Sequence, residues 1–128
     1  MSRVLIDTNA YSALMAGDEG IADLLGRSEA VLLSPIVLGE LFDGFRNGTR
    51  YRENAAILER FREQPRTVTV PVTDATAEWF GEIKAGLRRR GRPIPINDVW
   101  IAASCMEHGA LLLTRDGYFS EVDGLRLA

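Results

Sequence analysis

The sequence predicts a three-layer α/β/α fold built on a central, mainly parallel sheet. Strand-like segments alternate with helical segments along the chain, which is the pattern of a parallel sheet with helical crossovers. The strand-like segments are continuously apolar, as expected for strands that helices cover on both faces. The length of 128 residues, 46% of them hydrophobic, is that of one ordinary domain. We therefore expect residues 1–128 to form a single domain.

The first half of the chain predicts two strands and four helices. The polar cluster Asp7-Thr8-Asn9 suits a helix start, and Pro35 is well placed in the first turn of another helix. One apolar face of that later helix is marked at helical spacing by Val37, Leu38, Leu41, Phe42 and Phe45. The expected elements are a strand at 3–7, a helix at 9–16, a short helix ending near Gly26, a strand at 31–33, a helix from Pro35 to about Asn47, and a helix at 51–63.

The second half predicts a strand, two helices and a closing pair of strands. A helix from Asp74 carries an apolar stripe as far as an arginine cluster, and Gly91-Arg92-Pro93 ends it. The expected elements are a strand at 68–70, the helix from Asp74 to about residue 90, a helix from Asn97 or Asp98 to Glu107, a strand at 111–114, and a weak last strand at 125–127.

Four acidic residues lie where apolar segments begin, end or are interrupted: Asp7, Glu40, Asp98 and Asp116. A carboxylate is costly at such a place unless a cation compensates its charge. Asp7 and Asp116 follow predicted strands, so both are expected at the edge of the sheet where ligands bind in parallel α/β folds. Helices that start at this edge would bring Glu40 and Asp98 to the same crevice. The alternative is that each acid is separately a helix cap or a surface residue.

If the four carboxylates meet, they form a site for a hard divalent cation. An all-carboxylate site selects Mg²⁺ or Mn²⁺ over zinc, which prefers histidine or cysteine ligands. One or two such ions can orient a water and offset charge on a phosphodiester under attack. We assign Asp7, Asp98 and Asp116 to the metal, directly or through water. Glu40 either completes the shell or orients the attacking water.

The segments around these acids resemble the PIN-domain nucleases, specifically the VapC toxins of bacterial toxin–antitoxin pairs. The order and spacing of the motifs in so short a chain make the resemblance specific, although each motif alone is common. The matching segments are Val4-Leu5-Ile6-Asp7-Thr8-Asn9, Leu38-Gly39-Glu40-Leu41, Pro95-Ile96-Asn97-Asp98 with Ile101-Ala102-Ala103 after it, and Leu113-Thr114-Arg115-Asp116-Gly117-Tyr118-Phe119.

The resemblance implies a metal-dependent endoribonuclease that uses Mg²⁺ or Mn²⁺. It also implies a cognate antitoxin that inserts an arginine or lysine among the carboxylates, and a homodimer. The implied site consists of Asp7, Glu40, Asp98 and Asp116, with Thr8, Asn9 and Thr114 as supporting polar residues. Some relatives carry an acid or a histidine directly before the aromatic at position 119, whereas this chain has Tyr118 there.

Arginine makes up fourteen of the fifteen cationic residues, although the net charge is −3. The arginines concentrate at residues 46–66 and 88–92, and a guanidinium suits phosphate better than an ammonium does. Arg46 and Arg50, near Glu40 in sequence, are candidate RNA contacts. The alternative for most of these arginines is a solvated helix face or a cationic helix end.

Two other functions remain open at this stage. One is a non-catalytic RNA- or protein-binding module in which the acids serve structure or a partner's arginine. The other is a metal-dependent phosphatase acting on small phosphates. The glycines form no phosphate-binding loop of a nucleotide-binding protein. No apolar stretch approaches the roughly 18 residues of a membrane span, and no signal-peptide core follows Met1, so we expect a cytoplasmic protein.

Overall fold

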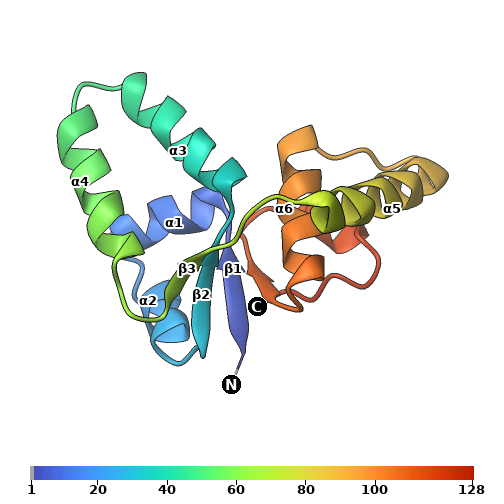
Figure 1. The fold of residues 1–128 in the computed structure, drawn as a ribbon, viewed down its shortest axis with the longest axis horizontal. Coiled ribbons are helices and arrows are strands. Elements are labelled where there is room, and N and C mark those ends of the chain that lie inside the picture. The colour runs from blue at the N-terminus through green and yellow to red at the C-terminus, as the bar shows by residue number, and fades with distance from the viewer. Residues whose placement is uncertain (1) are drawn as a thin grey trace.

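The computed structural model describes residues 2–128 and contains a four-stranded, all-parallel sheet (Figure 1). The strands are β1 (Arg3–Ile6), β2 (Ala30–Leu33), β3 (Thr67–Thr69) and β4 (Leu111–Leu113), in the sheet order β3-β2-β1-β4. The helices are α1 (Thr8–Met15), α2 (Glu19–Gly26), α3 (Pro35–Arg46), α4 (Tyr51–Arg62), α5 (Asp74–Arg90), α6 (Ile96–Glu107) and the 3₁₀ helix η1 (Gly117–Glu121). The predicted parallel α/β class is confirmed.

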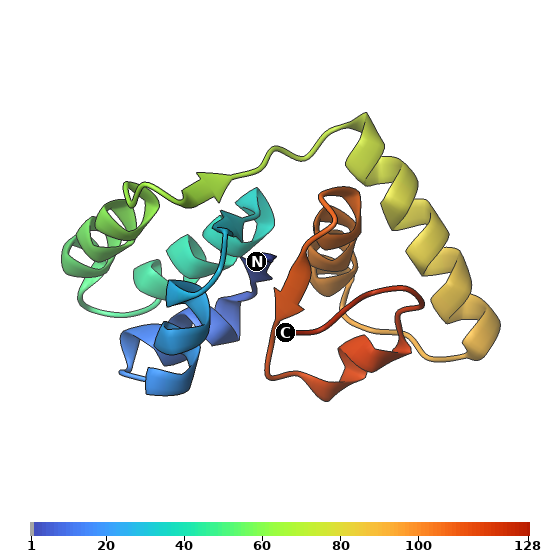
Figure 2. The same ribbon diagram turned by 90° about the horizontal axis from the view of Figure 1, so that it is seen from below.

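The strand order explains how the helices divide between the two faces. The chain moves across the sheet from β1 to β2 to β3, and β4 then returns to the far side of β1. Because crossovers between parallel strands are right-handed, a reversal of direction sends the intervening helices to the opposite face. Accordingly α1 to α4 lie to one side of the strands and α5 and α6 to the other (Figures 1 and 2). The reversal between β1 and β4 is the switch point at which such sheets bind ligands.

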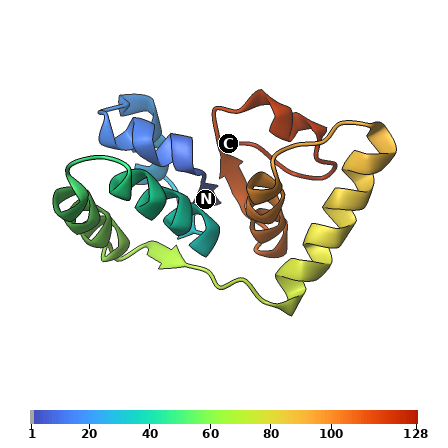
Figure 3. The same ribbon diagram turned by 90° about the horizontal axis from the view of Figure 1, so that it is seen from above.

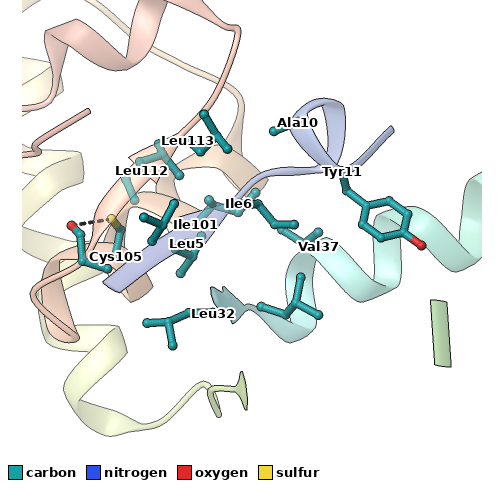
Figure 4. Packing of buried hydrophobic residues seen from close by; sticks show 14 of the residues in the cluster. Leu5, Ile6, Ala10, Tyr11, Leu32, Val37, Ile101, Cys105, Leu112 and Leu113 are labelled. Carbon is teal, nitrogen blue, oxygen red and sulfur yellow. Dashed lines mark hydrogen bonds between the residues drawn. The ribbon is translucent and has the colours of Figure 1, made fainter. Parts of the chain in front are cut away.

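The central strand is buried on both faces, as its continuous apolar sequence predicts. Val4, Leu5 and Ile6 are at most 1% exposed, and they pack between helices of both layers (Figure 4). Cys105 on α6 is also fully buried, and its thiol donates a hydrogen bond to the Ala110 carbonyl at 3.0 Å. Burial raises the pKa of this thiol to about 12. Cys105 is therefore a core residue and not an activated nucleophile.

The predicted last strand at residues 125–127 is wrong. Only a single bridge forms there, between Leu112 of β4 and Leu127. The Leu112 N–H donates to the Arg126 carbonyl at 2.9 Å, and the Ala128 N–H donates to the Leu112 carbonyl at the same distance. The segment thus covers the outer edge of β4 over one residue, too short a contact to continue as a strand.

Several element boundaries also differ by one or two residues from the sequence prediction, among them those of β3 and α6. The strand expected at 68–70 lies at Thr67–Thr69, although the Val70 N–H still donates to the Leu33 carbonyl at 2.9 Å. Helix α6 begins before Asn97, because the Pro95 carbonyl accepts the hydrogen bonds of the first turn. Among residues 2–128, no helix combines the length and apolarity that a membrane span requires.

Candidate functional site

The carboxyl ends of the two neighbouring strands β1 and β4 meet at Asp7. Asp7 follows β1 directly, is only 2% exposed, and caps α1 by accepting a hydrogen bond from the Ala10 N–H at 2.9 Å. Its second carboxylate oxygen accepts a hydrogen bond from the hydroxyl of Thr114, which follows β4. The same Thr114 hydroxyl accepts the N–H of Asp116 at 3.0 Å. Thr114 therefore links Asp7 to the loop that carries Asp116.

Asp116 lies half-buried at the N-terminal cap of η1, beside the start of α1. The Asn9 side-chain amide donates to Asp116 Oδ2 at 3.4 Å. Arg115, between Thr114 and Asp116, turns away from the acids and forms an ion pair with Asp18. The two acids that follow strands are thus held by polar side chains of α1 and of the β4 loop, and not by a cation.

Glu40 and Asp98 reach the same edge of the sheet on helices. Figure 3 views the molecule from above, with α3 and α6 on either side of the strands. Glu40, in the second turn of α3, accepts a hydrogen bond from the Thr8 hydroxyl at Oε1 and one from the Asn97 amide at Oε2, at 3.3 Å. Because Asn97 precedes Asp98 in the first turn of α6, these contacts connect α1, α3 and the start of α6.

Asp98 has a partner that the sequence did not predict. The hydroxyl of Tyr118, on η1, donates a hydrogen bond to Asp98 Oδ2. Asn97, the partner of Glu40, was also missed as a site residue. Tyr118 and Asn97 nevertheless both lie inside the motif segments. Their side-chain types alone carry no signal for these contacts, which depend on how α6 and η1 approach the sheet edge.

The pKa values of Asp7 and Asp98 are both raised above the ordinary value of an aspartate. Burial is the largest cause that raises the pKa of Asp7; hydrogen bonds from Thr114 and Ala10 oppose it, and the charges of Asp116 and Glu40 add to it. Burial likewise raises the pKa of Asp98; the Tyr118 hydrogen bond lowers it, and the charges of Glu40, Asp116 and Asp7 raise it further. The negative charges of Glu40 and Asp116 therefore disfavour the ionised forms of both Asp7 and Asp98.

The donor chemistry of this site fits a hard divalent cation. In the described part of the chain, none of the four carboxylates forms an ion pair with a basic side chain, so their charge is uncompensated. All the candidate ligands are oxygen atoms, which Mg²⁺ and Mn²⁺ prefer. Residues 2–128 nevertheless contain no ready-made set of three or more acidic, histidine or cysteine ligands. Each carboxylate instead has at least one oxygen hydrogen-bonded to a hydroxyl or amide.

The two candidate RNA contacts lie at the turn between α3 and α4. The Arg46 guanidinium lies over the ring of Tyr51, 4.4 Å from its centroid, and donates to the Tyr51 hydroxyl at 3.2 Å. Arg50 forms an exposed ion pair with Glu53 at 2.6 Å. Neither arginine belongs to the hydrogen-bonded network of the four acids among the described residues, so both stand apart from the site itself.

Fold and site together define a class of protein: a parallel α/β domain with four acidic side chains at the switch point of its sheet. A family model of the PIN domain matches residues 4–125. The chain therefore belongs to the PIN-domain family.

Within this family, the chain is similar to individual VapC and VapBC proteins. Ribonuclease VapC2 of Haemophilus influenzae is 31% identical over 118 residues, which cover 91% of this chain and 88% of that protein. The structure of DNA-bound VapBC from Salmonella typhimurium matches 100% of this chain and 98% of that chain, with a TM-score of 0.89 at 25% identity. The structure of VapBC-5 from Mycobacterium tuberculosis, a member of the VapBC family of toxin–antitoxin systems, is also similar. The match covers 99% of this chain and 100% of that chain, with a TM-score of 0.72 at 25% identity.

Proposed function

We propose that this chain is a metal-dependent endoribonuclease that acts as the toxin of a toxin–antitoxin pair. The observation that supports this function best is the gathering of Asp7, Glu40, Asp98 and Asp116, without a compensating cation, at the switch point of the sheet. The name of the Haemophilus relative supports RNA as the substrate class. The proposal treats residues 1–128 as a single nuclease domain, since the family match spans 4–125.

In the proposed mechanism, the acids divide between holding the ion and directing the water. A bound Mg²⁺ or Mn²⁺ ion supplies positive charge that offsets charge on the phosphodiester and lowers the pKa of a water molecule. Asp7, Asp98 and Asp116 would hold this ion directly or through water. Glu40 would complete the shell or orient the attacking water.

Polar neighbours keep the acids in the orientation that this chemistry needs. Thr114 and the α1 backbone restrain Asp7, while Thr8 and Asn97 each engage one oxygen of Glu40. Asn9 restrains Asp116 from the exposed side. Residues that orient metal ligands in this way typically contribute about 10–100-fold to metal affinity or activity.

We expect Arg46→Ala combined with Arg50→Ala to weaken RNA binding at low salt and to leave metal affinity intact. Each phosphate contact that is lost reduces the slope of log affinity against log salt by about 0.7 for a single strand. Arg50→Ala alone should have the smaller effect, because Glu53 already pairs with its charge. Filter binding over a salt series measures the RNA affinity and its salt slope.

Arg27→Ala is a control for these arginine variants. Arg27 is an exposed arginine at the end of α2, just before β2 begins at the opposite edge of the sheet. Equal salt slopes for the Arg46/Arg50 double variant and the wild type would assign the two arginines to a solvated face.

The proposed antitoxin has a candidate binding surface beside the site. A groove of about 320 Å³ between α1, α3 and α4 is lined by Tyr11, Ser12, Met15, Phe45, Asn54 and Ile57. Met15 and Ile57 are 43% and 37% exposed, so the groove offers apolar surface to a partner helix. The similarity to VapBC-5 supports a partner of this kind. A basic side chain from the antitoxin would then neutralise the four acids in place of metal. A homodimer and a cytoplasmic location belong to the same proposal.

Cleavage of a mixed cellular RNA pool tests the enzymatic proposal. We expect the purified protein to produce discrete cuts with Mg²⁺ or Mn²⁺, and both chelator and Asp98→Asn to abolish them. If wild type and variant bind RNA equally and neither cuts it, the binding-module alternative takes the lead. If small phosphoesters are hydrolysed and compete fully with RNA, the protein is a phosphatase instead.

A further inference from the structure

Tyr118 donates the one side-chain hydrogen bond to Asp98 that the described residues show. Its hydroxyl donates to Asp98 Oδ2, and no hydrogen bond among residues 2–128 involves Oδ1. The two oxygens of this carboxylate are therefore unequal. Oδ2 already accepts a hydrogen bond, whereas Oδ1 has no hydrogen-bond donor beside it among the described residues and is available to a cation. Tyr118 is 36% exposed, so it is not a core residue.

The segment that carries Tyr118 is held at both ends. At its start, the Asp116 N–H donates to Thr114. At its end, Arg90 of α5 donates to the Glu121 carbonyl at 2.7 Å. Between them, the ring of Phe119 is fully buried and lies 5.2 Å from that of Tyr118. The phenol is thus presented to Asp98 from an anchored turn.

We propose that Tyr118 is a positioning residue that directs Asp98 to bind its ion mainly through Oδ1. This proposal rests on the metal-dependent function proposed above. A carboxylate oxygen that accepts a phenol's hydrogen bond has only one lone pair left, so the free Oδ1 is the better ligand for a cation, whereas an unrestrained carboxylate binds readily through both oxygens. A phenol replaced by a phenyl ring would release Oδ2 and leave Asp98 free to rotate.

Single-oxygen binding has a consequence for the choice of ion. Mg²⁺ requires near-ideal octahedral geometry at short distances, while Ca²⁺ accepts six to eight oxygens and readily takes both oxygens of one carboxylate. Restraint of Asp98 by Tyr118 therefore favours Mg²⁺ and disfavours Ca²⁺. Loss of the hydroxyl should weaken Mg²⁺ binding and spare Ca²⁺ binding, which reduces the ratio of the two affinities.

The test is calorimetric titration of Mg²⁺ and of Ca²⁺ into RNA-free protein, for wild type, Tyr118→Phe, Tyr51→Phe and Asp98→Asn. Tyr51→Phe removes a phenol on α4 and is the matched control for metal binding. We expect Tyr118→Phe to lose roughly 10-fold in Mg²⁺ affinity and less in Ca²⁺ affinity, and Tyr51→Phe to match the wild type. A change in the affinity ratio is informative because a general loss of stability would weaken both ions alike.

Each other result overturns a definite part of this inference. If Tyr118→Phe keeps the wild-type ratio of affinities while Asp98→Asn loses binding, Tyr118 does not position Asp98 and the metal site stands. If the wild type binds neither ion, or Asp98→Asn binds both as the wild type does, the proposed metal-dependent function fails together with the role of Tyr118. Thermal melting of each metal-free variant verifies that the protein titrated is folded.

Discussion

Asp7→Asn is expected to abolish RNA cleavage and, at the same time, to stabilise the metal-free protein. Loss of a residue that holds the metal, directly or through water, should cost more than the roughly 10–100-fold that loss of a supporting residue costs. The fold should tolerate the change, because asparagine keeps an oxygen for the Ala10 N–H and presents an amide to the Thr114 hydroxyl. The same carboxylate is therefore expected to be required for activity and to destabilise the metal-free fold.

The pH dependence of this stabilisation follows from the raised pKa of Asp7. An acid with a raised pKa in the folded state contributes stability that is complete below its unfolded pKa and is lost as pH rises through the folded pKa. The ordinary value is 3.8, and burial moves the folded value above it. The stability advantage of Asp7→Asn should therefore vanish well below pH 3.8 and grow as pH rises through the folded pKa to a plateau.

Urea denaturation in chelator across a pH series measures this effect. Asp23→Asn is the control, since Asp23 is an exposed aspartate on α2. Added Mg²⁺ should raise the stability of the wild type and leave Asp7→Asn unchanged. Equal stability of wild type and Asp7→Asn at every pH would show that Asp7 carries no uncompensated charge in the folded protein.

Phe119→Ala is expected to have the largest effect on stability outside the central strands. Phe119 is one of the largest fully buried side chains, and truncation of a buried phenylalanine to alanine costs about 3–5 kcal/mol. The cost arises because the cavity left under η1 can close only in part. Since η1 carries Tyr118 and begins at Asp116, the variant should also weaken metal binding under conditions where it remains folded.

Chemical denaturation of Phe119→Ala and Phe45→Ala distinguishes two causes of lost stability. One is loss of the Phe119 ring that anchors η1, and the other is the general loss of apolar surface. Phe45 is only partly buried at the edge of the core, so its truncation should cost less. A loss below about 0.5 kcal/mol for Phe119→Ala would match an exposed substitution and would mean that η1 is not anchored by this ring.

Several parts of the fold follow from local physical chemistry alone. The continuous apolar run at 4–6 favours a strand covered on both faces, and Asp7 after it caps a helix, since its side chain can reach the N–H of Ala10. Alternating strands and helices in a short chain, joined by right-handed crossovers, place strand ends and helix starts at one edge. The sequence therefore determined the parallel class and the edge at which Asp7 and Asp116 lie.

The tertiary structure decided which side chains meet at that edge. The hydrogen bond from Tyr118 to Asp98 joins residues on η1 and α6, and that from Asn97 to Glu40 joins α6 to α3. Periodicity reports only which face of an element is buried, so it contains no information on such distant pairs. The same reason explains why the predicted strand at 125–127 was wrong: its pairing depended on the space left beside β4. The sequence by itself determined that the candidate metal ligands are carboxylate oxygens. The packing of the layers decided which side chains form hydrogen bonds with them.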